Sequence, residues 1–177
     1  PFLTLVAGAS VVKALSNLGV EASIKWPNDI IVHNKKICGI LTELSAEMER
    51  VNYVVIGIGI NIKTIDFPDE IKEKATSLYK EGYKLSRVDI VRQFCIEFEK
   101  LYKGYILDGN KQDTLELCRK YSAIIGKQVY VIKNNKRELV KCIDINENGN
   151  LIVKEKNGEI QEIMSGEVSI RGVKGYV

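Results

Sequence analysis

The stretch Ile24–Val32, IKWPNDIIV, joins two apolar runs through a proline-locked turn and places one cation beside that turn. Alternation predicts a strand over 22–26 in which Lys25 points away from the face that its two neighbours share. Pro27 ends this strand, because proline cannot donate to the ladder and restricts the residue before it to an extended conformation. The stretch therefore predicts a rigid strand end that carries a single lysine.

Apolar spacing around this stretch predicts an α+β fold. A helix at 4–18 precedes it, and a hairpin of strands 30–32 and 37–44, turning through 33–36, follows it. The run 51–60, VNYVVIGIGI, is nearly continuous in apolar residues, which is typical of a strand buried on both faces. These strands indicate a mixed sheet with helices packed on one side. The remaining predicted elements are a polar link at 46–50, a short helix at 69–79, a long helix from Ser86 to Tyr105, and a helix at 114–124.

The pattern changes to alternation after Gly126. Five short strands, separated by Asn-Gly turns such as Asn148-Gly149, occupy roughly fifty residues, which is typical of a small β-barrel. We therefore predict two domains, a first over residues 1–125 and a small β-barrel over residues 126–177.

Composition and charge exclude several classes of protein. A net charge of +3 is too small to indicate nucleic-acid binding, and the most basic cluster, Lys133–Arg137, fits a solvated hairpin tip. No apolar run reaches the length of a membrane span. Four widely spaced cysteines predict buried free thiols in a reducing cytosol rather than a zinc site, and His33 fits a turn residue better than a general base. We expect a cytoplasmic protein without a membrane, nucleic acid or dedicated metal site.

Lys25 is the first candidate for chemistry. Ligands usually bind at the strand ends of such sheets, and a lysine ammonium suits phosphate or carboxylate oxygens. On position alone, an ordinary solvent-facing lysine is the favoured alternative.

Glycines provide two further signals. Gly57 and Gly59 alternate at the end of the last strand and leave one face bare, so that a flat ring could lie on the backbone. Asn61 follows them and could offer a donor and an acceptor to a base or sugar. The alternative is a kinked strand with an asparagine-capped turn. Gly39 also permits a close approach, although alone it indicates a bulge.

Three linked motifs, KWPND, KICGILTEL and VVIGIGIN, resemble in order and spacing the catalytic domain of the biotin protein ligases (biotin–[acetyl-CoA-carboxylase] ligases), whose fold is related to class II aminoacyl-tRNA synthetases. The terminal strands resemble the small Src-homology-3-like C-terminal domain of that family, so the likeness covers nearly the whole chain. The resemblance implies that biotin and MgATP form biotinyl-5′-AMP, and that the biotinyl group then passes to a lysine of the biotin carboxyl carrier protein. It also implies a homodimer.

The resemblance further implies a role for particular residues. Lys25 matches the active-site lysine, which contacts the biotin carboxylate and the α-phosphate, and Asn61 matches a residue on the nucleotide side. The positions that match the biotin pocket are Lys25, Ile30, Gly39, Ile40, Gly57 and Gly59.

The chain departs from the family pattern upstream. The Gly/Arg-rich loop, G-R-G-R in type, that closes over biotin and phosphate does not occur in this sequence, nor does the winged helix of some members. We therefore expect the C-terminal portion of a longer ligase, or a ligase whose other half is a separate chain, with an incomplete site. The alternatives are a lipoate or octanoate ligase, which shares the lysine-centred fold, and a non-catalytic binding module that retains the fold.

Overall fold

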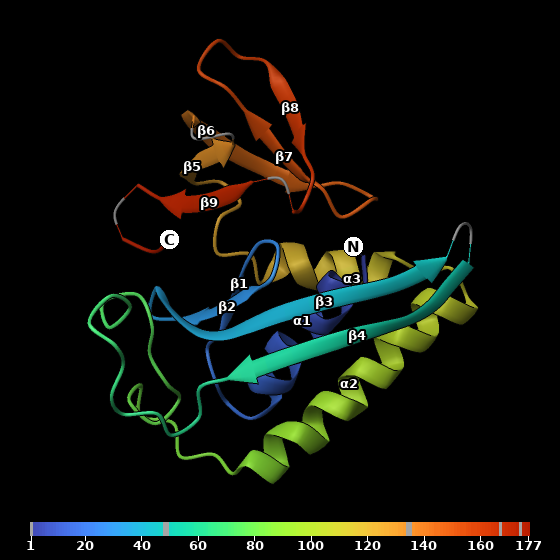
Figure 1. Cartoon of the computed structure of the whole chain (residues 1–177), viewed down its shortest axis with the longest axis vertical. Helices are drawn as coiled ribbons and strands as arrows, with labels where there is room; N and C mark the ends of the chain where they lie inside the picture. Colours follow the sequence, from blue (N-terminus) through green and yellow to red (C-terminus); the bar gives the residue numbers. More distant parts are fainter. Residues whose placement is uncertain (1, 48–49, 134–135, 167, 174) are drawn as a thin grey trace.

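The computed structural model describes residues 2–47, 50–133, 136–166, 168–173 and 175–177. Figure 1 shows a sheet backed by helices, with a second sheet stacked above it. The helices are α1 (Phe2–Asn17), α2 (Arg87–Leu107) and α3 (Gln112–Lys120). The strands are β1 (Ser23–Lys25), β2 (Asp29–Val32), β3 (Lys35–Glu47), β4 (Arg50–Ile60), β5 (Gln128–Lys133), β6 (Lys136–Ile145), β7 (Leu151–Lys154), β8 (Ile160–Ile163) and β9 (Ser169–Gly172).

The first sheet has the order β1-β2-β3-β4, and each pairing between these strands is antiparallel. The parallel component of the expected mixed sheet is limited to two isolated bridges, one between Ile24 and Ser122 and one between Lys36 and Ala75. The α+β class is confirmed. The turn between β2 and β3 places His33 at a φ of 47°, in the left-handed conformation that two-residue hairpin turns require.

Helix α1 covers one face of this sheet. It contacts β1, β2 and β3 as well as α2 and α3, and most of its residues are buried. A Cβ placed on Gly8 would lie 3.7 Å from the Cδ1 atom of Ile40, so the small residue lets the helix approach the sheet closely. The Thr4 hydroxyl donates to the Thr42 hydroxyl at 2.9 Å and joins the same two elements.

The prediction that residues 51–60 are buried on both faces is wrong. Among the described residues, strand β4 pairs only with β3, and its odd-numbered residues are exposed, Tyr53 to 62% and Val55 to 50%. The apolar run reflects one face whose isoleucines pack against the core and a second face that no described residue covers.

Two other predicted segments also differ. Residues 69–79 form turns rather than a helix, because Ile71 is the only large aliphatic side chain between 69 and 75 and no apolar stripe can hold a helix against the core. The expected link at 46–50 is shorter, since β3 continues to Glu47 and β4 begins at Arg50; residues 48–49 lie outside the described part.

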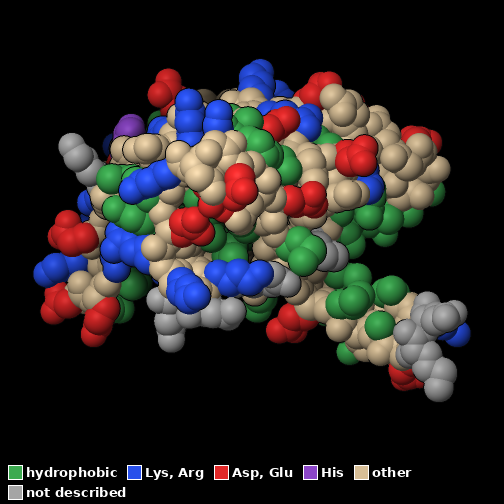
Figure 2. All heavy atoms as spheres, turned by 90° about the horizontal axis from the view of Figure 1, so that it is seen from above, with side chains coloured by type: hydrophobic (Ala, Val, Ile, Leu, Met, Phe, Trp, Pro, Cys, Tyr) green, Lys and Arg blue, Asp and Glu red, His purple; other side chains and the backbone are tan. Residues whose placement is uncertain are grey.

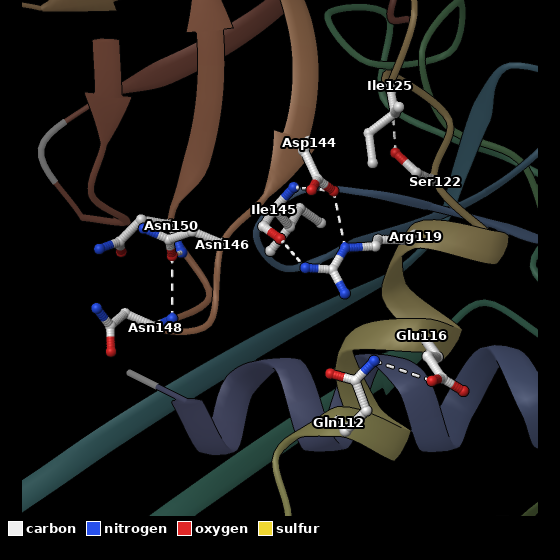
Figure 3. Close-up of polar contacts among 10 residues, drawn as sticks. All are labelled: Gln112, Glu116, Arg119, Ser122, Ile125, Asp144, Ile145, Asn146, Asn148 and Asn150. Carbon is white, nitrogen blue, oxygen red and sulfur yellow. Dashed lines mark hydrogen bonds and ion pairs between the residues drawn. The ribbon is translucent and has the colours of Figure 1, made fainter. Parts of the chain in front are cut away.

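The second sheet has the order β8-β7-β6-β5-β9, which confirms five strands in a small terminal unit. Its turns use glycines with positive φ, 83° at Gly149 and 94° at Gly158. In Figure 3 the side chain of Asn146 accepts from the backbone of Asn148, and the Asn150 backbone donates to the same oxygen at 3.0 Å. Of the predicted basic tip at 133–137, residues 134–135 lie outside the described part.

Polar contacts join the second sheet to the first part of the chain, and one apolar cluster contains residues of both sheets. The Trp26 indole donates to the Gly149 carbonyl at 3.0 Å. Figure 3 shows Arg119 of α3 reaching β6, where it donates to the Asp144 carboxylate at 2.7 Å and to the Ile145 carbonyl at 2.5 Å. The expected division at residue 126 lies between α3 and β5.

The structure also tests the expectations of buried free thiols and of no membrane-spanning helix. All four cysteines are free; Cys38, Cys118 and Cys142 are buried as predicted, whereas Cys95 is exposed because it lies off the apolar stripe of α2. None of the described helices is long and apolar enough to cross a membrane.

Candidate active site

Lys25 is the last residue of β1 and the first of four residues that pair in succession across the first sheet, which we call the lysine row: Lys25, Asp29, Gly39 and Gly59. Lys25 pairs with Asp29 of β2, and Asp29 pairs with Gly39 of β3. Gly39 in turn pairs with Gly59 of β4. Because directly paired residues project to the same side of a sheet, Lys25 and the two bare glycines share one face.

This face is the one opposite α1. Gly57 also belongs to it, because Gly57 and Gly59 are two residues apart, and Leu41, which pairs with Gly57, is 63% exposed. The sheet therefore offers an open surface with Lys25 at one end. Its base is the exposed backbone at Gly57 and Gly59, which we call the glycine floor. Side-chain alternation in the sequence predicted which face Lys25 and the glycines would occupy within their own strands. The register of the four strands places them on the same face.

Nothing in the described chain requires glycine at 57 or 59. A Cβ on Gly57 would lie 3.7 Å from its nearest neighbour, and one on Gly59 would lie 3.9 Å away, both ordinary contact distances. Neither residue has a positive φ. Since glycine in a strand interior costs stability, a close approach by something outside these residues is the physical reason that remains.

The Lys25 side chain is buried, so the solvent-facing alternative is wrong. Only 3% of the residue is exposed, and its Nζ lies 3.4 Å from the centroid of the Tyr176 ring. No oxygen of the described residues accepts a hydrogen bond from this ammonium. Burial lowers the pKa of Lys25 to about 8, opposed by the charge of Asp29.

Asp29 is the carboxylate of the site, and both of its oxygens are engaged. One forms an ion pair with the Lys36 ammonium, and the other accepts from the Tyr176 hydroxyl. A Cβ on Gly39 would lie 3.0 Å from the Lys36 Nζ, so the third glycine makes room for this second lysine. With Arg171 also close enough to act on Lys25, the site carries an excess of positive charge and suits anions.

Lys36 and Tyr176 are the residues that sequence reasoning missed. Lys36 lies in the turn that the sequence predicts over 33–36. A register irregularity between Ile30 and Ile31 places it on the same side of the sheet as Asp29. Tyr176 reaches Asp29 across 147 residues, and no local pattern marks it.

Two of the expected pocket residues do not reach the open face. Ile30 pairs with Cys38 one position away from the lysine row, so its side chain points to the opposite side, as does that of Ile40. Both are buried in the core beneath α1. The backbone of Ile40 instead supports the turn, because its N–H donates to the Asn28 carbonyl at 2.9 Å and its carbonyl accepts from the Asn28 amide at 2.8 Å.

Asn61 lies just after β4, at the end of the glycine-floored strand. Its side-chain nitrogen donates to the Thr76 carbonyl at 3.1 Å, and its backbone carbonyl accepts from Leu78 at 2.9 Å. The residue therefore anchors the loop that follows β4. Its side-chain oxygen makes no hydrogen bond to the described residues and is the group left for a ligand.

Comparisons with known proteins point to one family. The model of the Biotin/lipoate A/B protein ligase family matches residues 1–61, and that of the Biotin protein ligase C terminal domain matches residues 124–171. The Bifunctional ligase/repressor BirA of Bacillus subtilis (strain 168) is 38% identical over 174 residues, which cover 96% of this chain and 53% of the relative. That of Escherichia coli (strain K12) is 27% identical, with 97% and 54% covered. The chain thus spans about half the length of the curated relatives it matches.

Solved structures extend the likeness to the arrangement in space. The biotin protein ligase from Aquifex aeolicus in complex with biotin and ATP superposes with a TM-score of 0.83 at 29% identity, covering 97% of this chain and 71% of that chain. The apo structure of the same ligase gives a TM-score of 0.84. One family model covers residues 1–61, which include the first sheet, and a second covers most of the second sheet. The curated relatives from Bacillus subtilis and Escherichia coli align with nearly the whole chain. The chain therefore belongs to the biotin protein ligase family.

Proposed function

We propose that this chain supplies the lysine-bearing part of a biotin–[acetyl-CoA-carboxylase] ligase, which activates biotin with ATP and transfers it to a lysine of the biotin carboxyl carrier protein. The observation that carries the proposal is the buried Lys25 ammonium, which lacks an oxygen partner among the described residues and shares a face with the glycine floor. The Aquifex aeolicus ligase in complex with biotin and ATP supports it. So does the name Biotin--[acetyl-CoA-carboxylase] ligase of a Mycobacterium tuberculosis relative, 34% identical over 85 residues.

The first step is the attack of the biotin carboxylate on the α-phosphorus of ATP. A new bond joins the carboxylate oxygen to phosphorus, the bond to the β-phosphate oxygen breaks, and pyrophosphate leaves with the electron pair. The attacking and attacked groups are both negative. The fixed Lys25 ammonium offsets their repulsion and stabilises the charge of the in-line transition state.

The second step transfers the biotinyl group. The neutral amine of the carrier lysine attacks the carbonyl carbon of biotinyl-5′-AMP, the bond from that carbon to the phosphate oxygen breaks, and AMP leaves while the amine releases a proton. The Lys25 ammonium can then stabilise the charge that returns to the AMP phosphate.

The glycine floor gives biotin a place to lie. Without side chains at Gly57 and Gly59, a flat ring can rest on the backbone of β4, with its carboxylate directed along the row toward Lys25. In the same proposal the side-chain oxygen of Asn61, one residue beyond the strand, accepts a hydrogen bond from the nucleotide.

Mg²⁺ enters this proposal with the nucleotide. The described residues contain no cluster of three or more His, Cys, Asp or Glu side chains that could hold a metal ion, and the oxygens of Asp29 are engaged by Lys36 and Tyr176. We therefore propose that the triphosphate oxygens carry the ion, which would neutralise phosphate charge there.

Three finer points belong to the same proposal. The match over residues 124–171 to a biotin protein ligase domain favours biotin over lipoate or octanoate. We also propose that the enzyme acts in the cytoplasm, a reducing compartment in which the buried thiols of Cys38, Cys118 and Cys142 stay free. A homodimer is expected through the open edge of β4, whose exposed apolar side chains include Tyr53 and Val55. Figure 2 shows hydrophobic side chains along an arm that projects from the body of the molecule.

The test is an adenylation assay on the full-length gene product with α-labelled ATP and either biotin or lipoate. We expect labelled biotinyl-AMP from biotin and no adduct from lipoate. When a purified carrier domain is added, it should gain biotin but no label, because the labelled phosphate leaves with AMP. Preference for lipoate would favour the lipoate ligase alternative. No adduct from either acid, together with no binding of biotinyl-AMP by calorimetry, would leave a non-catalytic binding module.

The homodimer has its own measurement. Light scattering after gel filtration should give twice the monomer mass, and Tyr53→Lys, which places a charge on the exposed apolar strand, should shift the protein toward the monomer. A monomeric wild-type protein at high micromolar concentration would contradict this part of the proposal.

A further inference from the structure

The last residues of the chain fold back onto the end of β1, far from the strand in sequence. Tyr176 is half-buried there, with its ring 3.4 Å from the Lys25 Nζ and its hydroxyl donating to Asp29. Figure 1 shows the C-terminus below β9, on the side of the second sheet that faces β1 and β2. The terminal unit thus contributes a side chain to the lysine site of the first sheet.

The backbone around the tail fixes this placement. Gly172, the last residue of β9, pairs with Val129 of β5. A Cβ on Gly172 would lie 2.3 Å from the carbonyl carbon of Val177 and 2.8 Å from its Cα, so the tail packs directly on the bare glycine. The position of Tyr176 therefore depends on Gly172, a residue of the second sheet.

We propose that Tyr176 is a positioning residue for Lys25: its ring holds the ammonium at the strand end, and the packing of the tail on Gly172 holds the ring there. The reaction that Tyr176 would assist is the one in the proposed function, whereas the contacts of Tyr176 with Lys25 and Asp29 are independent of it. A ring face attracts a desolvated ammonium without using its capacity to donate to oxygen. The N–H bonds of the Lys25 ammonium that point away from the ring stay available for carboxylate and phosphate oxygens.

The surrounding charges explain why such a restraint is needed. Lys25 is faced by Asp29 from β2, Lys36 from β3 and Arg171 from β9. Arg171 and Lys36 disfavour the charged form of Lys25, and the one carboxylate that favours it, Asp29, is shared with Lys36 in an ion pair. The face of the Tyr176 ring adds a contact that favours the charged ammonium over the neutral amine. Burial and the hydrogen bond to Asp29 raise the pKa of the Tyr176 hydroxyl, so it stays a donor.

The experiment compares four variants of the full chain. Tyr176→Phe keeps the ring and removes the hydroxyl, whereas Tyr176→Leu removes the ring and keeps apolar cover. Gly172→Ala displaces the tail without touching Lys25. Val173→Ala, at an exposed residue of the same tail, is the matched control. The first readout is the pKa of Lys25, followed by NMR through its labelled side-chain ε-carbon and assigned with Lys25→Met. The second is the rate of biotinyl-AMP formation in the full-length product.

We expect Tyr176→Phe and Val173→Ala to keep the pKa of Lys25 near the wild-type value. Tyr176→Leu and Gly172→Ala should change it, with Tyr176→Leu lowering it by about one, a tenfold change in the protonation equilibrium. The adenylation rate at saturating biotin should fall at least about tenfold in Tyr176→Leu and be retained in Tyr176→Phe. This rescue by phenylalanine separates positioning by the ring from a merely structural role.

Two results would overturn the proposal. One is an unchanged Lys25 pKa in Tyr176→Leu with the variant folded. The other is faster adenylation in Tyr176→Leu or Gly172→Ala, which would make the ring an obstruction rather than a support. The pKa is measured without substrates, so a protein that forms no biotinyl-AMP would refute the proposed function while the pKa series still decided the role of Tyr176.

Discussion

A buried lysine whose ammonium lacks an oxygen partner among the described residues destabilises a fold, and Lys25 is such a residue. Moving an ammonium out of water costs free energy unless a partner or ligand compensates. At Lys25 the described protein provides an aromatic ring and a carboxylate already shared with another lysine. A residue in this condition is retained for what it binds rather than for stability.

The first prediction concerns the charge itself. Lys25→Met keeps most of the side-chain volume and removes the ammonium. The rate of biotinyl-AMP formation should fall about 10²–10³-fold, the usual effect of losing one group that stabilises transition-state charge. The melting temperature should not fall, because the burial penalty disappears with the charge. Lys84→Met, at an exposed lysine, is the control and should leave the rate unchanged; equal rates in both variants would contradict the role of Lys25.

The second prediction is a pH dependence with a definite sign. The pKa of Lys25 is about 8 in the folded chain, below the ordinary value of 10.5. Activity at subsaturating biotin should therefore decline above about pH 8, as the free protein loses the charge that attracts the anions. A profile that stays flat to pH 10 would show that the charge of Lys25 is not needed.

The same pKa affects stability in the opposite direction. Between about pH 8 and 10.5 the unfolded chain binds more protons at Lys25 than the folded chain does, so the contribution of this residue to stability rises with pH. Below pH 8 the burial penalty is fully present. Urea denaturation of wild type and Lys25→Met across this window should show the difference between them narrowing as the pH rises.

At the scale of elements, β4 has two faces with different tasks. Its even-numbered residues from Val54 to Ile60 are half-buried on the α1 side of the sheet, while Gly57 and Gly59 on the other face leave backbone exposed beside Lys25 and Asp29. Strand periodicity separates packing from binding within a single strand.

The third prediction tests these faces separately. Gly57→Ala should leave the free energy of unfolding unchanged or raise it by about 0.5–1 kcal/mol, because alanine is better than glycine inside a strand and its Cβ meets no obstacle. The same change should raise KM for biotin by intruding on the floor. Ile58→Val, on the α1 face, should instead cost roughly 0.5–1.5 kcal/mol and leave KM unchanged. Denaturant titration and steady-state kinetics measure both quantities; a Gly57→Ala protein with wild-type KM would argue against the floor.

At the scale of the whole molecule, the second sheet holds the KWPND turn from two sides. The Trp26 indole donates to the Gly149 carbonyl, and Tyr176 reaches Asp29 from the tail. Because an apolar cluster contains residues of both sheets, the two parts should unfold together.

The fourth prediction follows from this joint. Trp26→Phe removes the donor and leaves the buried Gly149 carbonyl without it, so stability should fall by about 1–3 kcal/mol. Thermal unfolding by calorimetry should still show a single transition at a lower temperature. Two separated transitions in the wild-type protein would mean that the sheets are independent.

Sequence reasoning succeeded where the determining chemistry is local. Proline after Trp26, helical spacing in 4–18, and Asn-Gly turns between alternating strands each constrain only a few neighbouring residues. It failed at 69–79, where charged residues of good helix propensity lack a core to pack on, and at 51–60, where an apolar run did not reveal how many faces are covered.

The sequence alone determined the strand end with its lysine, the glycines that bare one strand face, and the family to which such linked motifs point, because backbone conformation and side-chain alternation are properties of adjacent residues. Only the tertiary structure decided that Lys25 is buried, that Lys36 neutralises Asp29, and that Tyr176 lies on the ammonium. Burial and charge pairing depend on which distant segments meet. In this protein the tail meets the turn 147 residues away.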